Sequence, residues 1–195
     1  MYYPSGHKLN AKIQAPFVLA ELRALRSSIF KSSPEVQRAI AIADTIERSY
    51  DLQRGDLYLP AFETFCAVLE PFAQTILTGT MRRVGYEIFP QYATILGVPA
   101  NNVKAAMNVH SGGDLLQLIC GAYTSCVTGP DAGGLVAELR GATGTVTDTT
   151  FMPCQLQIGV FLGAAKLTGL FRETALVERR CRQKGDSACV YEFTF

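Results

Sequence analysis

Residues 178–193 read ERRCRQKGDSACVYEF, two short runs of residues separated by a Lys-Gly-Asp turn. This pattern predicts an antiparallel β-hairpin. A turn centred on Gly185 places Cys181 opposite Cys189, with their Cβ atoms about 5 Å apart. Side chains alternate between the two faces of a strand, so both thiols share a face with Tyr191. We therefore expect the two cysteines to point into an apolar core.

The same register fixes the positions of the acidic residues in this hairpin. It places Glu178 opposite Glu192, on the face away from the thiols. Two like charges directly opposed are unfavourable in a sheet. We therefore expect a positive side chain nearby, and Arg180 is the simplest candidate.

A second hairpin and a helix precede this stretch. Residues 135–140 and 145–150, the latter rich in Thr and Val, are separated by a turn and are typical of β-strands. The apolar residues between Pro153 and Gly169 recur at helical spacing. The last third of the chain is therefore predicted to form four strands around one helix.

The first two-thirds of the chain has helical periodicity. The predicted helices span residues 16–30, 34–50, 60–69, 81–96 and 114–127, with Pro71 ending or kinking the third. Gly85 is expected where a neighbouring element approaches closely. Helices followed by four strands predict an α+β fold with an antiparallel sheet. We expect one domain, in which residues 1–58 are a helical N-terminal extension and residues 59–195 the main part.

The composition excludes several classes of protein. Lys and Arg number 18 against 17 Asp and Glu, so the chain lacks the excess of positive charge that is typical of nucleic-acid-binding proteins. No apolar run is long enough to insert into a membrane. The N-terminal residues lack the pattern of a secretory signal, so we expect a cytoplasmic protein whose six cysteines are reduced.

Three cysteines are candidate metal ligands. Two facing thiolates, Cys181 and Cys189, would form half of a tetrahedral soft-metal site. Cys154 follows Pro153 at the start of the preceding helix, where the helix N-terminus favours a thiolate. The alternative is that all three are small buried hydrophobic residues.

A set of motifs in this part of the chain resembles the 4-vinyl-reductase-like domain family: Pro153-Cys154, Glu178-x-x-Cys181, Lys184-Gly185-Asp186 and Cys189. The resemblance is specific over residues 133–195 and weaker over 59–96. It implies a dimeric α+β domain, similar more distantly to the Bet-type subunits of vesicle-tethering complexes. In the sensor branch of the family a structural zinc is bound at positions that correspond to Cys154, Glu178, Cys181 and Cys189.

The resemblance also implies a function. The family includes stand-alone proteins tied to bacteriochlorophyll and photosystem biogenesis, and sensor domains of phenol-responsive activators. The His and Trp that contact phenol in the sensors do not carry over, because this chain has no Trp and His110 lies in a different motif. The stand-alone branch is favoured. Its implied role is to bind a tetrapyrrole (heme, bilin or chlorophyll precursor) or another hydrophobic pigment-related ligand, as a homodimer, and to assist a pigment-protein assembly partner or sensing.

Ligands of the family lie between the helices and the sheet. The residues expected to line such a pocket are Tyr86, Phe89, Tyr92, His110, Cys120, Tyr123 and Cys126. A His or Cys there would hold the metal centre of a tetrapyrrole or form a thioether. The alternative is that Cys120 and Cys126 are ordinary buried helix residues and that His110 is a surface loop residue.

The sequence does not favour an enzyme. It contains no G-x-S-x-G motif, no Ser-His-Asp order and no G-x-G-x-x-G motif after a strand. We therefore expect a non-catalytic binding protein despite the word "reductase" in the family name. Two alternatives remain open: a dimeric assembly scaffold without a ligand, and a zinc-stabilised sensor of small aromatic molecules.

Overall fold

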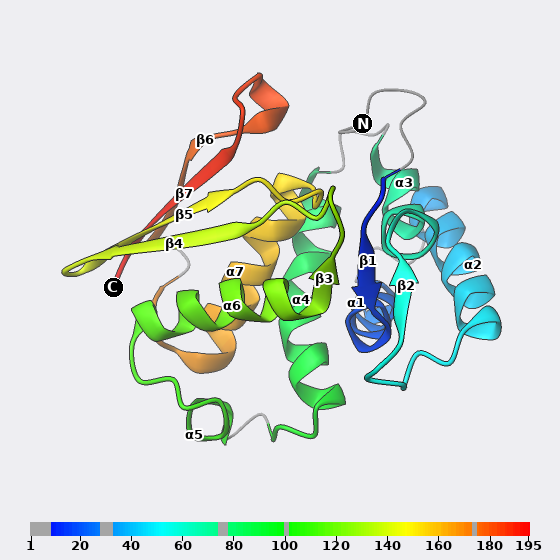
Figure 1. Ribbon diagram of the computed structural model, residues 1–195, viewed down its shortest axis with the longest axis horizontal. Helices are drawn as coiled ribbons and strands as arrows, with labels where there is room; N and C mark the ends of the chain where they lie inside the picture. The colour runs from blue at the N-terminus through cyan, green and yellow to red at the C-terminus, as the bar shows by residue number, and fades with distance from the viewer. Residues whose placement is uncertain (1–8, 28–32, 74–77, 100–101, 173–174) are drawn as a thin grey trace.

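The computed structural model of the protein describes residues 9–27, 33–73, 78–99, 102–172 and 175–195. The fold is α+β, as predicted (Figure 1). A four-stranded antiparallel sheet packs on one side of a group of helices. None of the helices within these ranges is long and apolar enough to cross a membrane.

The larger sheet contains β4 (Leu135–Arg140), β5 (Thr143–Asp148), β6 (Leu176–Arg180) and β7 (Cys189–Thr194), in the order β4-β5-β7-β6. Burial alternates along β5 and β7, because one face of the sheet meets the helices and the other is more open. The prediction of two hairpins around one helix is confirmed.

Helix α7 (Cys154–Thr168) packs on the inner face of this sheet. The ring of Phe161 lies 5.5 Å from that of Tyr191 and 5.1 Å from that of Phe193, between ring centroids. The helix ends at Gly169, whose φ of 64° is the left-handed conformation that glycine accepts at a helix end. Helix α6 (Gly112–Cys126) begins with a capping box between Ser111 and Asp114.

The closest helix packing is between α7 and α4 (Thr78–Ile95), and it depends on glycine. A Cβ at Gly159 would lie 2.1 Å from the Arg82 carbonyl oxygen, and one at Gly163 would lie 2.0 Å from that of Tyr86. Gly85 faces α7 in the same way, so the expected close approach at this residue is confirmed.

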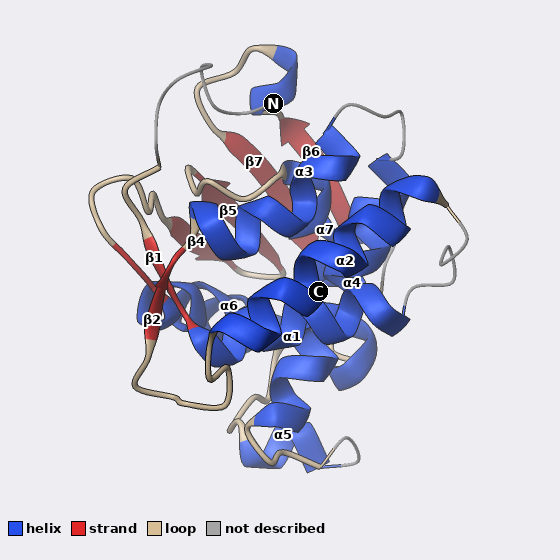
Figure 2. Cartoon of the chain, turned by 90° about the vertical axis from the view of Figure 1, so that its right-hand side faces the viewer, coloured by secondary structure: helices blue, strands red, loops and turns tan. Residues whose placement is uncertain are grey.

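The N-terminal helices are part of the same core. Helix α1 (Ala15–Ser27) packs against α4, and α2 (Pro34–Ser49) packs against α1 and α3 (Ala67–Ala73). Figure 2 shows α1 and α2 on the side of the molecule away from the larger sheet. The short helix α5 (Val103–Ala106) precedes α6. Residues 28–30 of the first predicted helix lie outside the described residues.

A second sheet was not predicted from the sequence. It has the order β2-β1-β3 and consists of β1 (Lys12–Gln14), β2 (Tyr58–Pro60) and β3 (Val127–Thr128). Strands of two or three residues are too short to show an alternating pattern. Residue 60 therefore ends a strand instead of starting a helix. A π-helical turn, Phe62–Cys66, leads into α3, and Pro71 lies inside α3 without ending it.

The predicted register of the last hairpin holds next to the turn, where Arg180 pairs with Val190, and is wrong farther from it. Glu178 pairs with Tyr191 and not with Glu192, because a β-bulge at residue 179 adds one residue to β6. A bulge reverses which face the following side chains point to. Glu178 therefore lies on the face that carries Tyr191, which is the face of the thiols.

The charges of this hairpin are also paired differently from the prediction. Arg179, not Arg180, forms the ion pair with Glu192, at 2.7 Å. Lys184 Nζ lies 3.1 Å from a carboxylate oxygen of Glu178. The two glutamates are thus not opposed, and each has its own cation.

Candidate metal centre and apolar pocket

Three cysteines come together where the last hairpin meets α7. Cys154 begins α7, Cys181 follows β6, and Cys189 begins β7. Their sulfur atoms all lie within 4.8 Å of one another, and all three residues are buried. The sequence predicted this group, and a cluster of three thiols could hold a metal ion.

The structure joins two of these cysteines in a disulfide. The bond links Cys154 to Cys189, whose Cα atoms are 6.8 Å apart, and leaves Cys181 as a thiol. This differs from the expectation that all cysteines are reduced. The sequence argument used the absence of a secretory signal, which says nothing about how close two sulfurs lie in the fold. The cluster therefore has an oxidised form with one thiol and a reduced form with three.

Glu178 lies beside this cluster because of the bulge in β6. Its Oε2 accepts a hydrogen bond from Lys184. Its Oε1 is buried and accepts no hydrogen bond from any described residue. Burial raises the pKa of the Cys181 thiol, and the Glu178 carboxylate raises it further. The carboxylate therefore lies against Cys181, and a buried carboxylate oxygen beside a thiol is a place that a cation could occupy.

Arg182 connects the hairpin tip to the segment before Cys154. Its backbone N–H donates to Cys189 Sγ over 3.4 Å. Its guanidinium donates to the carbonyl oxygens of Thr150 and Met152 and lies 3.5 Å from Asp148 Oδ1. One side chain thus holds both the hairpin and the loop that leads into α7.

Asp148 is the buried centre of this network. It accepts hydrogen bonds from the Thr150 N–H (2.7 Å) and the Tyr191 hydroxyl (3.3 Å). Burial raises the pKa of its carboxyl, whereas Arg182 and these hydrogen bonds oppose the rise. The sequence analysis did not identify Asp148 or Arg182. The signal that could have found Asp148 is its place on the inward face of β5, where a charged residue requires a partner.

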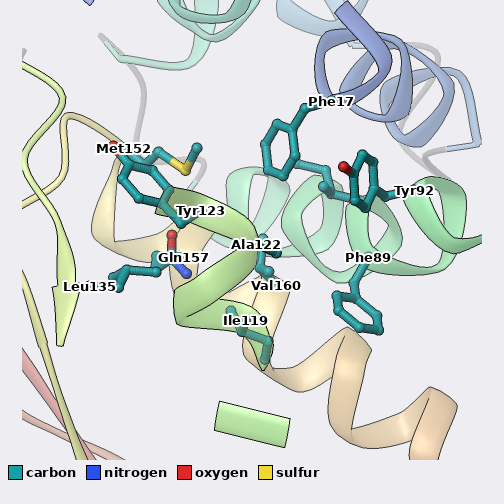
Figure 3. A pocket seen from close by; sticks show the side chains of 11 residues that line it. Phe17, Phe89, Tyr92, Ile119, Ala122, Tyr123, Leu135, Met152, Gln157 and Val160 are labelled. Carbon is teal, nitrogen blue, oxygen red and sulfur yellow. The ribbon is translucent and has the colours of Figure 1, made fainter. Parts of the chain in front are cut away.

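A small apolar pocket lies among α1, α4, α6 and α7 (Figure 3). Its volume is about 30 Å³, room for about two water molecules. Three of the seven expected residues line it: Phe89, Tyr92 and Tyr123. The other lining residues are Phe17, Ile88, Ile119, Ala122, Leu135, Met152, Gln157 and Val160.

The other four expected residues lie elsewhere. His110 is exposed, and its ring is hydrogen-bonded to Asn108 at 3.0 Å. The ring of Tyr86 lies 5.2 Å from both the Arg83 guanidinium and the Lys166 ammonium group. These placements match the alternative in which His110 is a surface residue.

Cys120 and Cys126 are buried in α6 but do not line the pocket. Burial raises the pKa of the Cys120 thiol to about 11. Cys126 Sγ is hydrogen-bonded to the Tyr92 hydroxyl at 3.1 Å. Both are thus neutral helix residues at pH 7, which is the alternative reading given for them above.

Gln157 and Phe17 are pocket residues that the sequence analysis missed. Gln157 is 2% exposed, and its Oε1 has no hydrogen-bond partner among the described residues. A signal for it was present, because it lies three residues after Cys154 and four before Phe161, on the buried face of α7. A polar residue at such a position is either paired or functional. Phe17 comes from α1, which had no assigned role.

Comparison of the chain with protein-family models and with curated proteins finds no match. The cysteine cluster and the pocket are therefore the features from which a function is inferred.

Proposed function

We propose that this protein is a zinc-stabilised binding domain for a small apolar molecule, related to the 4-vinyl-reductase-like family. One observation carries the proposal: α7 belongs to both sites. Cys154, its first residue, is in the cysteine cluster, and Gln157 and Val160 line the pocket. A metal ion that fixes the start of α7 would also fix one wall of the pocket.

The donor set suits zinc. Three thiolates are ligands that a tetrahedral zinc site prefers. The Glu178 carboxylate lies against Cys181, and it would have to move closer to Cys154 and Cys189 to serve as the fourth ligand. The N–H of Arg182 that donates to Cys189 Sγ is the kind of outer contact that orients a metal-bound thiolate. Zinc here would have a structural role, linking the hairpin tip to α7.

Zinc and the disulfide are mutually exclusive. Both use the sulfurs of Cys154 and Cys189, and a metal ligand must be a thiolate. Under the proposal, the reduced protein holds zinc and the oxidised protein holds the disulfide.

The pocket supports a small ligand. Its walls are aliphatic and aromatic, and about 30 Å³ is far smaller than any tetrapyrrole. A heme, bilin or chlorophyll precursor would require the helices to separate, and the described lining residues include no His or Cys to hold its metal centre. Binding of a tetrapyrrole stays a prediction, as do the homodimer, the pigment-assembly partner and the cytoplasmic location. Of the alternatives, a small aromatic ligand has the better support.

The zinc proposal is tested by elemental analysis of protein purified with a reductant. We expect about one zinc per chain in the wild type and in Cys66→Ser, because Cys66 is outside the cluster. Cys181→Ser should lose most of the zinc and melt at a lower temperature. Wild-type protein without zinc, or a Cys181→Ser variant that retains it, would contradict the proposal.

An interaction scaffold is the second candidate function. The outer face of the larger sheet exposes Val136 (60%) and Val177 (42%), and exposed apolar side chains on a sheet favour association. Val136→Lys tests this candidate by light scattering coupled to gel filtration. A dimer that becomes a monomer would support the scaffold, and an unchanged mass would argue against this face.

A further inference from the structure

The amide oxygen of Gln157 is a buried acceptor to which no described residue donates. The side chain extends from α7 into the wall of the pocket, where Figure 3 labels it among apolar and aromatic side chains. It is 2% exposed, and no described residue donates to Oε1. A buried carbonyl without a donor costs free energy, which a partner in the pocket would recover.

The other polar groups of the pocket wall already have partners. The Tyr123 hydroxyl donates to the carbonyl oxygen of Ala132. The Tyr92 hydroxyl is hydrogen-bonded to Cys126 Sγ. None of the described residues that line the pocket is an Asp, Glu, Lys or Arg. Among the described lining residues, Gln157 Oε1 is therefore the buried side-chain acceptor that has no hydrogen bond of its own.

We propose that Gln157 determines the specificity of the pocket, by selecting a small uncharged ligand that donates a hydrogen bond from an N–H or O–H group. The inference rests on the proposed ligand-binding function of the same pocket. A charged ligand would have no counter-ion there and would lose its hydration. An apolar ligand without a donor would leave Oε1 unsatisfied, and sites built in this way discriminate against such analogues.

The size of the pocket restricts the ligand to a small ring or a short chain. Met152 is a lining residue with a flexible side chain. Its side chain is therefore the part of the pocket wall that can change rotamer to admit a ring. The aromatic residues Phe17, Phe89 and Tyr123 offer ring faces and edges for stacking. An N–H heteroaromatic ring of five atoms has the required donor and ring faces, and it would fit once the Met152 side chain moves, because it is larger than two water molecules.

The test compares pyrrole with furan, rings of the same size of which only pyrrole has a donor. Each is titrated into the reduced, isotope-labelled full-length chain, and binding is followed by the amide NMR signals of the lining residues. We expect pyrrole to bind about 5- to 10-fold more tightly than furan, the effect of one net hydrogen bond. Gln157→Leu should abolish this preference.

Gln155→Leu is the matched control. Gln155 is on the same helix, but it accepts its hydrogen bonds from Arg82 and does not line the pocket. This variant should keep the preference for pyrrole. If Gln157→Leu does not fold, Gln157→Met supplies an apolar, unbranched side chain of similar length for the same measurement.

The outcomes separate the inference from the function on which it rests. Equal binding of pyrrole and furan to the wild type would mean that a buried water already satisfies Oε1. This result would overturn the inference about Gln157 but would still support the ligand-binding function of the pocket. A preference that survives in Gln157→Leu would overturn the role of Gln157. No binding of either ring up to its solubility limit would overturn the ligand-binding function itself.

Discussion

Asp148 and Glu21 are both fully buried carboxyl groups, but they lie in different parts of the molecule and have opposite surroundings. Asp148, in the sheet half, is contacted by Arg182, Tyr191 and Thr150. Glu21, in α1 of the helical half, has no hydrogen-bond partner for either carboxyl oxygen among the described residues. Burial alone raises its pKa well above the usual range.

This comparison distinguishes the two halves. Beside the cysteine cluster, Asp148 and its partners form a network that holds the hairpin tip and the start of α7 in place, and Glu178 Oε1 is the described acceptor there that this network leaves without a hydrogen bond. In the helical half, the carboxyl oxygens of Glu21 in α1 and the Oε1 of Gln157 in the pocket wall are buried without a hydrogen-bond partner among the described residues. A network in which groups satisfy one another fixes a geometry, which suits a metal site. Unsatisfied groups destabilise the free protein, and their presence near a pocket suits binding.

The largest expected effect comes from breaking the network. Asp148→Asn keeps the shape of the side chain but removes the charge that faces Arg182. Since it leaves a poorly exposed cation without its partner, we expect the free energy of unfolding to fall by about 3 kcal/mol. Urea denaturation measures this. A loss below about 0.5 kcal/mol would show that the network does not hold the sheet half together.

A smaller loss is expected where the two halves meet, at the contact of α4 with α7. Gly159→Ala places a Cβ against the backbone of Arg82, so the helices must separate. We expect a loss of about 2 kcal/mol. Gly121→Ala is the control, because its Cβ in α6 meets nothing within 4 Å, and it should stabilise by about 0.5 kcal/mol. Equal effects of both changes in thermal unfolding would contradict the close packing.

Glu21 should respond in the opposite direction from Asp148. Because its folded-state pKa is raised above the usual 4.5, the folded protein keeps a proton that the unfolded chain releases. Stability therefore falls as the pH rises above that usual value, and it levels off only above the raised pKa. Glu21→Gln should remove this dependence and stabilise the protein by on the order of 1 kcal/mol at pH 8.

The measurement is the free energy of unfolding of Glu21→Gln and wild type at pH 5 and pH 8. The stabilisation by the substitution should be larger at pH 8. The same stabilisation at both pH values, or a loss of stability at pH 8, would mean that Glu21 has a partner when ionised.

The sequence predicted the fold class and the long elements because their periodicity is regular. It predicted Cys154, Cys181 and Cys189 from residue types and spacing. It did not predict the bulge at Arg179. One inserted residue turns the side chains on one side of it to the opposite face of the sheet, but it does not alter the amino-acid composition of the strand. The position of Glu178 on the thiol face followed from that bulge alone.

The residues that line the pocket were predicted only in part. Phe89, Tyr92 and Tyr123 were among the aromatic residues expected to line the ligand cavity that the family resemblance implies. His110 was chosen for its chemistry, although its loop lies at the surface. Gln157 and Glu21 were overlooked because a single polar residue on an apolar helix face is invisible to an argument from average hydrophobicity.

X-ray absorption at the zinc edge, on reduced protein loaded with zinc, shows whether the reduced cysteine cluster is a zinc site that includes Glu178. A count of reactive thiols in the zinc-free reduced chain accompanies it. We expect a first shell of three sulfurs and one oxygen, and six titratable thiols after reduction. Zinc bound by nitrogen and oxygen alone, or a chain that keeps only four thiols because the Cys154–Cys189 disulfide resists reduction, would contradict this expectation.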